Sequence, residues 1–345
     1  QDDYGGFNLT FEAYPRMAQI VKEAVGDKGL VFVLSGGSCV HVGERVISRC
    51  HPGSGGKVAV LRVASNCYPC LLDRAKFECD MVFTREEDKK AAVEELLDFM
   101  ACHKGGVPAL MGTERELIIK RRSGSSDPYR ELKEESNRVA RDLLPRAMEF
   151  YEQSPDKIEA LIRIASAANS MEFGVKGHDF DNLTFGRVFA DTLQENLYAD
   201  MAELNRRLQS FGKILYLTDN CGEVIFDLFV IEKLKEMGKT VVVGSKSEPI
   251  INDVTADELK SFSEVDVIPT GNVVGTALEH LSPEASVLLF DPEWLILSKG
   301  MGNFETMSEF DQRLKGRLIY ILRAKCEPVA AKMAVPRGSL VARPI

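Results

Sequence analysis

Polar side chains able to bind a metal ion follow directly after two apolar runs of strand type. The run "KILYL" at residues 213–217 leads into Asp219 and Asn220, and the run "TVVVGSK" leads into Asn252 and Asp253. In an open α/β sheet, ligands bind beyond the carboxyl ends of the strands. Two carboxylates and one amide oxygen meeting there suit a hard divalent cation such as Mg²⁺. We therefore predict a cation site formed by Asp219, Asn220 and Asp253.

A third apolar run, "WLILS", ends in a lysine and a glycine-containing loop. Lys299 follows the run, and Gly300 to Asn303 continue the loop. Glycines permit close approach of the backbone, and a lysine ammonium can pair with a phosphate as a point charge. A cation and such a lysine at one edge of a sheet are suited to catalysing phosphoryl transfer or phosphate-ester hydrolysis. The chain has no G-x-x-x-x-G-K-[ST] loop, which argues against a P-loop kinase.

Ordinary turn and helix-cap roles are the alternative for the strand-end residues, because Asp and Asn are common in both places. Recurrence at two successive strand ends favours a site, but the residues alone allow both interpretations. In the helix expected after "KILYL", Glu223 and Asp227 lie one turn apart on the same face. Glu223 is nearer the loop and is predicted to orient water or substrate. Asp227 lies further into the helix and is predicted to be structural.

The elements that must position these residues show as an alternation of short apolar runs and amphipathic segments. The runs are "KILYL", "TVVVGS", "VDVIP", "SVLLFD", "WLILS" and "RLIYILRA". This alternation predicts an α/β fold with a parallel, doubly wound sheet and helices on both faces. The preceding residues, from about 66 to 212, carry mainly the apolar spacing of helices.

Composition narrows the class of protein. The chain of 345 residues has a formal net charge of −9, which argues against general binding to nucleic acid or to a membrane surface. It contains no run of about 18 apolar residues, so no transmembrane helix is predicted. Its eight cysteines are scattered and no secretory signal precedes them, which indicates thiols of a reducing compartment. We therefore expect a cytoplasmic protein.

Several segments in order resemble the damage-control phosphatases, a family of metal-dependent phosphatases. The stretches "YLTDNCGEVIFD", "EPIINDVT" and "ILSKGMGNFET" look like its three signature segments. The stretches "SNCYPCLLDRAK", "DPYRELKEESN", "AANSMEFG" and "LRAKCEPVA" are similar to its archaeal-type branch, and the resemblance runs from about residue 63 to the C-terminus. It implies an α-helical part, residues 61–212, packed on a Rossmann-like α/β domain, residues 213–345, that binds metal and phosphate.

The resemblance also implies roles for single residues. One divalent cation (Mg, Mn, Co or Ni) would be held by Asp219, Asn220 and Asp253, and the substrate phosphate by Lys299. The expected substrate-binding residues are Asn169, Asn252, Lys299, Gly300 and Asn303, and the expected catalytic residues are Glu172, Glu223 and Lys299. We expect a metal-dependent phosphatase of small phosphorylated metabolites, such as sugar phosphates or related damaged metabolites. The alternative is a non-catalytic sensor that binds a phosphometabolite through the same strand ends.

The motif Cys67-Tyr68-Pro69-Cys70 allows several roles. A C-x-x-C pair can be redox-active, half of a zinc site, or an inert part of a core. No second C-x-x-C follows at zinc-ribbon spacing, and the family resemblance suggests Cys326 as a third thiol.

The first 60 residues differ from the rest. Residues 7–37 resemble the last helix and strand of a histone-deacetylase-like amidohydrolase, but the place of that family's catalytic tyrosine reads Ser35-Gly36-Gly37-Ser38. The upstream zinc-binding parts are also absent from the sequence. We therefore interpret residues 1–60 as a deacetylase-like remnant and linker without deacetylase chemistry.

Overall fold

The structure is a computed structural model that describes residues 32–33, 39–40, 60–170 and 182–345, with the backbone alone at 32–33, 39–40 and 182–186. The chain divides into two compact units, Gln1–Val58 and Ala59–Ile345. In the first unit, strands β1 (Phe32–Val33) and β2 (Cys39–Val40) pair antiparallel. The other residues of the expected remnant and linker lie outside the described residues.

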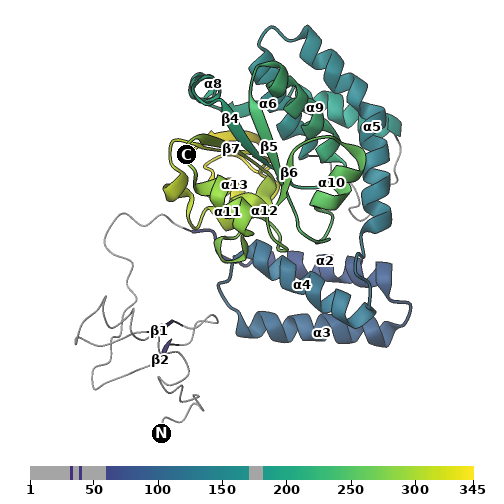
Figure 1. The fold of residues 1–345 in the computed structure, drawn as a ribbon. Coiled ribbons are helices and arrows are strands. Elements are labelled where there is room, and N and C mark those ends of the chain that lie inside the picture. Colours follow the sequence, from purple (N-terminus) through teal and green to yellow (C-terminus); the bar gives the residue numbers. More distant parts are fainter. Residues whose placement is uncertain (1–31, 34–38, 41–59, 171–181) are drawn as a thin grey trace, which may run out of the picture. The chain divides into compact units, whose positions relative to one another are not determined.

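A seven-stranded sheet forms the centre of the second unit (Figure 1). Its strands are β3 (Leu197–Ala199), β4 (Lys213–Leu217), β5 (Thr240–Ser245), β6 (Val267–Pro269), β7 (Trp294–Lys299), β8 (Leu318–Arg323) and β9 (Leu340–Pro344). They lie in the order β3-β9-β8-β7-β4-β5-β6, and every neighbouring pair is parallel except β8 and β9. The predicted α/β fold with a mostly parallel, doubly wound sheet is confirmed.

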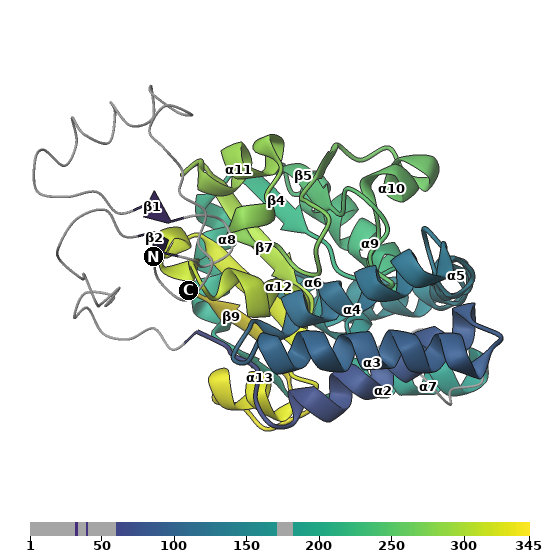
Figure 2. The same ribbon diagram turned by 90° about the horizontal axis from the view of Figure 1, so that it is seen from below.

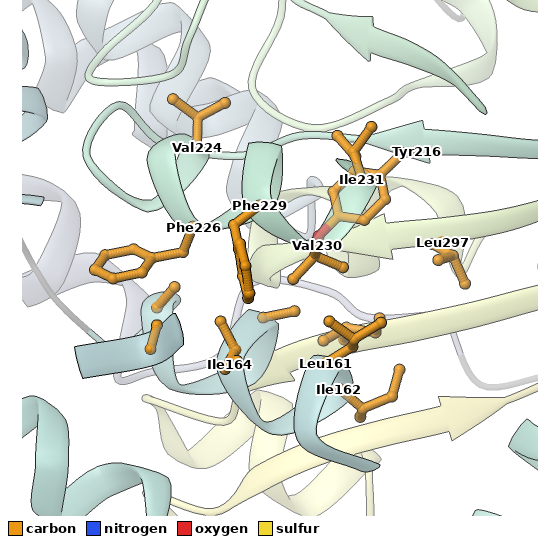
Figure 3. Packing of buried hydrophobic residues seen from close by; sticks show 14 of the residues in the cluster. Leu161, Ile162, Ile164, Tyr216, Val224, Phe226, Phe229, Val230, Ile231 and Leu297 are labelled. Atoms are coloured by element: carbon orange, nitrogen blue, oxygen red, sulfur yellow. The ribbon is translucent and has the colours of Figure 1, made fainter. Parts of the chain in front are cut away.

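Helices cover both faces of this sheet. One face carries α5 (Arg130–Gln153), α6 (Lys157–Ala168), α7 (Asn182–Leu193), α8 (Met201–Ser210), α9 (Glu223–Glu236) and α10 (Ala256–Phe262). The other carries α11 (Pro283–Phe290), α12 (Gly300–Met307) and α13 (Glu327–Lys332), and short 3₁₀ turns occupy Leu278–His280 and Asp311–Leu314. Alternate residues of one strand serve the two faces, since Tyr216 packs in one apolar cluster and Leu215 in the other. Figure 3 shows α6 and α9 packing around Tyr216 and Leu297.

Three further helices lie beside the sheet domain and pack on one another (Figure 2). They are α2 (Cys67–Val82), α3 (Glu86–Cys102) and α4 (Pro108–Ser123), and they share an apolar cluster of their own. Helix α4 has proline at its first position and ends at Gly124, which adopts a left-handed φ of 72°. It also contacts α12, so one element of the helical part reaches the edge of the sheet where strands β4, β5 and β7 end.

Two features of the sheet differ from the sequence prediction. The run "SVLLFD" forms most of helix α11 instead of a strand, because the Ser282 side chain accepts the Ala285 N–H and Pro283 opens the helix. Strands β9 and β3 were not predicted. Strand β3 comes from the range expected to be helical, and it pairs with β9 at one edge of the sheet. None of the helices in the described parts of the chain is long and apolar enough to span a membrane.

Candidate active site

The loops after β4 and β5 are joined by backbone hydrogen bonds, which bring their polar residues together. The N–H of Cys221 donates to the Asn252 carbonyl at 2.8 Å, and the N–H of Val254 donates to the Asp219 carbonyl at 3.0 Å. Asn220 and Asp253 form an isolated antiparallel bridge. The expectation that these strand ends present their side chains at one edge of the sheet agrees with the observed geometry.

Two amide side chains and Glu223 surround the Asp219 carboxylate. Asp219 Oδ2 accepts hydrogen bonds from Asn169 Nδ2 at 3.0 Å and from Asn220 Nδ2 at 2.9 Å. Asn169 Nδ2 also donates to Glu223 Oε2 at 2.8 Å, and Asn220 Nδ2 lies 3.3 Å from the same oxygen. Asn169 ends helix α6 and its Oδ1 accepts the N–H of Arg323, so the helical part is tied to strand β8 through this residue.

Burial disfavours the charged forms of the acidic side chains at this edge. It raises the pKa of Asp219 well above the ordinary value, and the carboxylates of Glu223 and Asp253 raise it further. Burial likewise raises the pKa of Asp253 to about 6, although Lys246, whose Nζ lies 3.6 Å from Asp253 Oδ2, partly offsets the effect. That oxygen is buried and has no hydrogen-bond partner among the described residues. A cation bound between these oxygens would compensate their charge.

Lys299 lies behind this group and contacts carboxylates, and its expected contact with phosphate stays a prediction. It is fully buried, and its Nζ lies 2.6 Å from Glu223 Oε1 and 2.7 Å from Asp227 Oδ1. Tyr216 donates its hydroxyl to the same oxygen of Asp227 at 2.6 Å. Burial by itself lowers the pKa of Lys299, but the two carboxylates outweigh it and raise the pKa, so the ammonium stays charged. Asp227, which was predicted to be structural, is an ion-pair partner of Lys299.

Gly300 and Asn303 contact neighbouring groups of the protein, and their expected substrate-binding roles stay predictions. The Asn303 amide donates to the carbonyls of Thr218 and Lys299 at 3.0 and 2.8 Å, and its Oδ1 accepts the Thr276 hydroxyl at 2.7 Å. Gly300 has a φ of 78°, and a Cβ built on it would lie 1.8 Å from Asp219 Oδ2. Glycine at this position therefore lets the Asp219 carboxylate lie against the backbone of the third loop.

This close approach gives a prediction for Gly300→Ala. The added methyl group forces Asp219 out of position, so we expect kcat/KM for phosphate-ester hydrolysis to fall by about tenfold or more, on the scale of a misplaced catalytic group. Gly316→Ala is the matched control, since Gly316 has a φ of 87° and nothing within 4 Å of its built Cβ. It carries the backbone strain without the clash. Equal effects of the two substitutions on kcat/KM would contradict the assignment of Asp219.

A cavity of about 280 Å³ opens onto the strand ends. Of the residues expected at the site, it is lined by Asn169, Asp219, Asn220, Asn252 and Asp253. Glu223, Lys299, Gly300 and Asn303 are not among the described residues that line it. Glu172 lies outside the described residues, so its expected catalytic role stays a prediction.

Basic residues that the sequence analysis did not single out also line the cavity. They are Arg74 on α2, Arg115 on α4 and Lys325 after β8. Lys325 is half-buried and its charge lowers the pKa of Asp219, which places the ammonium near the strand-end carboxylates. The signal for Lys325 in the sequence was its position just after the apolar run "RLIYILRA", the same position that drew attention to Lys299.

The three cysteines of interest line the same cavity. Cys67 and Cys70 stand in the first turn of α2, and Cys326 directly precedes α13. All three are free thiols. Within the described ranges, no three side chains of His, Cys, Asp or Glu are grouped so that they could hold a metal ion. The candidate cation ligands at the strand ends are two carboxylates and one amide. They are therefore not a group of three such side chains.

Comparison with known proteins identifies the family. The profile of the damage-control phosphatase ARMT1-like domain matches residues 63–341 of the chain. The chain belongs to the damage-control phosphatase ARMT1-like family. It is 31% identical over 291 residues to a damage-control phosphatase of Archaeoglobus fulgidus, a match covering 82% of this chain and 99% of that protein. It is 30% identical over 292 residues to a damage-control phosphatase of Pyrococcus horikoshii, covering 81% and 97% of the two chains.

A solved structure supports the same assignment. The crystal structure of a DUF89 family protein from Pyrococcus horikoshii superposes with a TM-score of 0.73 at 30% identity. The match covers 82% of this chain and 99% of the other. Family membership supports phosphatase activity and confirms the resemblance seen in the sequence.

Proposed function

We propose that this protein is a metal-dependent phosphatase of small phosphorylated metabolites, with one divalent cation bound by Asp219, Asn220 and Asp253. The observation that carries the proposal is the meeting of two strand-end loops at one cavity. They bring together two buried carboxylates, one of which has an oxygen without a hydrogen-bond partner among the described residues. Oxygen ligands of this kind suit Mg²⁺ or Mn²⁺. A cavity of about 280 Å³ suits a small metabolite.

The side chains around the cavity have different roles in binding the cation and the phosphate. A divalent cation bound at the strand ends supplies positive charge that offsets charge on the phosphoryl oxygens. Lys325 pairs with a phosphate oxygen as a point charge, the role first expected of Lys299. Asn169 and Glu223 hold the Asp219 carboxylate through their shared hydrogen bonds. Glu223 thereby acts on Asp219 indirectly, through the amide side chains that line the cavity. Lys299 holds Glu223 in place by an ion pair.

The test is hydrolysis by the purified full chain. A panel of phosphorylated metabolites and p-nitrophenyl phosphate is incubated with Mg²⁺, Mn²⁺, Co²⁺ or Ni²⁺, and phosphate release is measured. We expect turnover that a chelator removes and that added metal restores, because the carboxylates by themselves repel the phosphate.

Two other outcomes discriminate between the alternatives. Calorimetric binding of a phosphometabolite without phosphate release, under every metal, would favour the non-catalytic sensor. Hydrolysis that persists undiminished after exhaustive chelation would contradict the cation site.

A further inference from the structure

Part of the cavity wall has no role in the proposed chemistry. It is formed by Glu305 on α12, Cys67 on α2 and Cys326 before α13. Glu305 is buried with 9% of its surface exposed, and its carboxyl accepts the N–H of Ala109 from the first turn of α4. Among the described residues, the Ala109 N–H is the donor found for this carboxyl group, so the group has hydrogen-bonding capacity left for a ligand.

These three side chains make this wall neutral. Burial raises the pKa of Glu305 to about 8, and the Ala109 N–H offsets only part of that effect. Glu305 in turn acts on the two thiols across the wall, because its negative charge raises the pKa of each. Burial raises the pKa of Cys67, and it raises the pKa of Cys326 to about 11. Near neutral pH the carboxyl and both thiols therefore keep their protons. We name Glu305, Cys67 and Cys326 the neutral wall.

The charged residues lie at the strand-end part of the cavity. Asp219, Asp253 and Lys325 carry the charges that a cation and a phosphate dianion require. A desolvated phosphate is stabilised by opposite charges, whereas an uncharged carbon chain with hydroxyl groups needs hydrogen bonds without net charge. A protonated carboxyl group has one O–H to donate, and in Glu305 the group also accepts the Ala109 N–H.

We propose that the neutral wall binds the organic part of the phosphorylated substrate, and that Glu305 donates a hydrogen bond to one of its hydroxyl groups. The inference rests on the proposed phosphatase function and adds the orientation of the substrate. The phosphate group lies at the ends of β4, β5 and β8, and the hydroxylated carbon chain lies along α12.

The test compares two esters that differ only in hydroxyl groups. Glycerol 3-phosphate and n-propyl phosphate have the same chain length and alkyl leaving groups, so their kcat/KM ratio reports recognition of hydroxyls. We expect Glu305→Leu to lower this ratio by about tenfold, the size of one lost hydrogen bond to a buried group. Glu305→Gln keeps a donor of the same shape and is expected to retain most of the ratio. Glu284→Leu, at an exposed position on α11, is the surface control.

A second measurement covers the case in which Glu305→Leu does not fold. In the wild type the ratio falls as the pH rises through about 8, because Glu305 loses the proton that it donates. In Glu305→Gln the ratio does not change over the same range. Equal losses on both esters, or a ratio that neither substitution nor pH alters, would overturn the inference. Hydrolysis of neither ester by the wild type with Mg²⁺ or Mn²⁺ would overturn the proposed function and the inference with it.

Discussion

Replacing Asp219 or Asp253 by alanine is expected to lower kcat/KM for metal-dependent hydrolysis by at least about 10³-fold. Each substitution removes one of the two carboxylates that would hold the proposed cation, and no other carboxylate among the described cavity residues is placed at the strand ends. Glu305 also lines the cavity, but it belongs to the neutral wall. Metal affinity should fall together with activity, because a carboxylate ligand supplies charge that its neighbours do not replace.

Thermal stability distinguishes a variant that has lost a metal ligand from a variant that has lost its fold. A carboxyl group whose pKa is raised in the folded state stabilises the protein while protonated, and this contribution is lost as the pH rises through the raised value. For Asp253 that value is about 6, so at pH 8 and without metal Asp253→Ala is expected to unfold at the same temperature as the wild type or higher. In Asp219→Ala, the Asn169 amide still donates a hydrogen bond to Glu223, so its N–H group keeps a partner.

Metal titration by calorimetry and circular dichroism melting check both expectations. Asp257→Ala is the matched control, since this aspartate lies on α10, with 91% of its side chain exposed. It should change neither activity nor metal affinity. An Asp219 or Asp253 variant that keeps wild-type kcat/KM in metal-supplemented buffer would show that the cation site is assigned wrongly.

Local patterns predicted the part of the site that follows from strand ends. The apolar runs of β4, β5 and β7 are short and bounded by polar residues, and parallel strands present the same ends at one edge. Asp219, Asn252 and Asp253 could therefore be located before any contact was known. Helix α11 could not be distinguished from a strand by its five apolar residues, because a short buried run has no diagnostic periodicity. The Ser282-Pro283 cap was the only local signal.

The roles of the two lysines depended on contacts that no local pattern contains. Lys299 pairs with Asp227 and Glu223, which lie 72 and 76 residues earlier in the chain. Both acids are on the buried inner face of α9, where a carboxylate is costly unless a cationic side chain pairs with it. Lys325 reaches the cavity because β8 lies next to β7, and the order of strands in a sheet is set by tertiary packing. Sequence reasoning located the edge of the sheet correctly, and assigned the phosphate-facing lysine to the wrong strand end if Lys325 has the role proposed here.

Replacing Lys299 by methionine is expected to lower the free energy of unfolding by about 3–5 kcal/mol, the cost of leaving buried carboxylates without their partner. The Lys299 ammonium is fully buried between Glu223 and Asp227, and burial alone already raises the pKa of Asp227. Activity should fall as well, because Glu223 is then free to move away from the amides that hold Asp219.

Urea unfolding of a matched set of variants tests this account of Lys299. Lys213→Met removes an exposed ion pair with Glu293 and should cost less than about 1 kcal/mol. The triple variant Lys299→Met, Glu223→Gln, Asp227→Asn removes the charges together, so it should recover much of the stability lost in Lys299→Met. Its activity should still be lowered, because the carboxylate of Glu223 that accepts from Asn169 has been replaced by an amide. If Lys299 bound phosphate directly, Lys299→Met would keep wild-type stability and metal affinity and lose only phosphate binding. That result would assign the phosphate contact to Lys299 at the end of β7 instead of to Lys325.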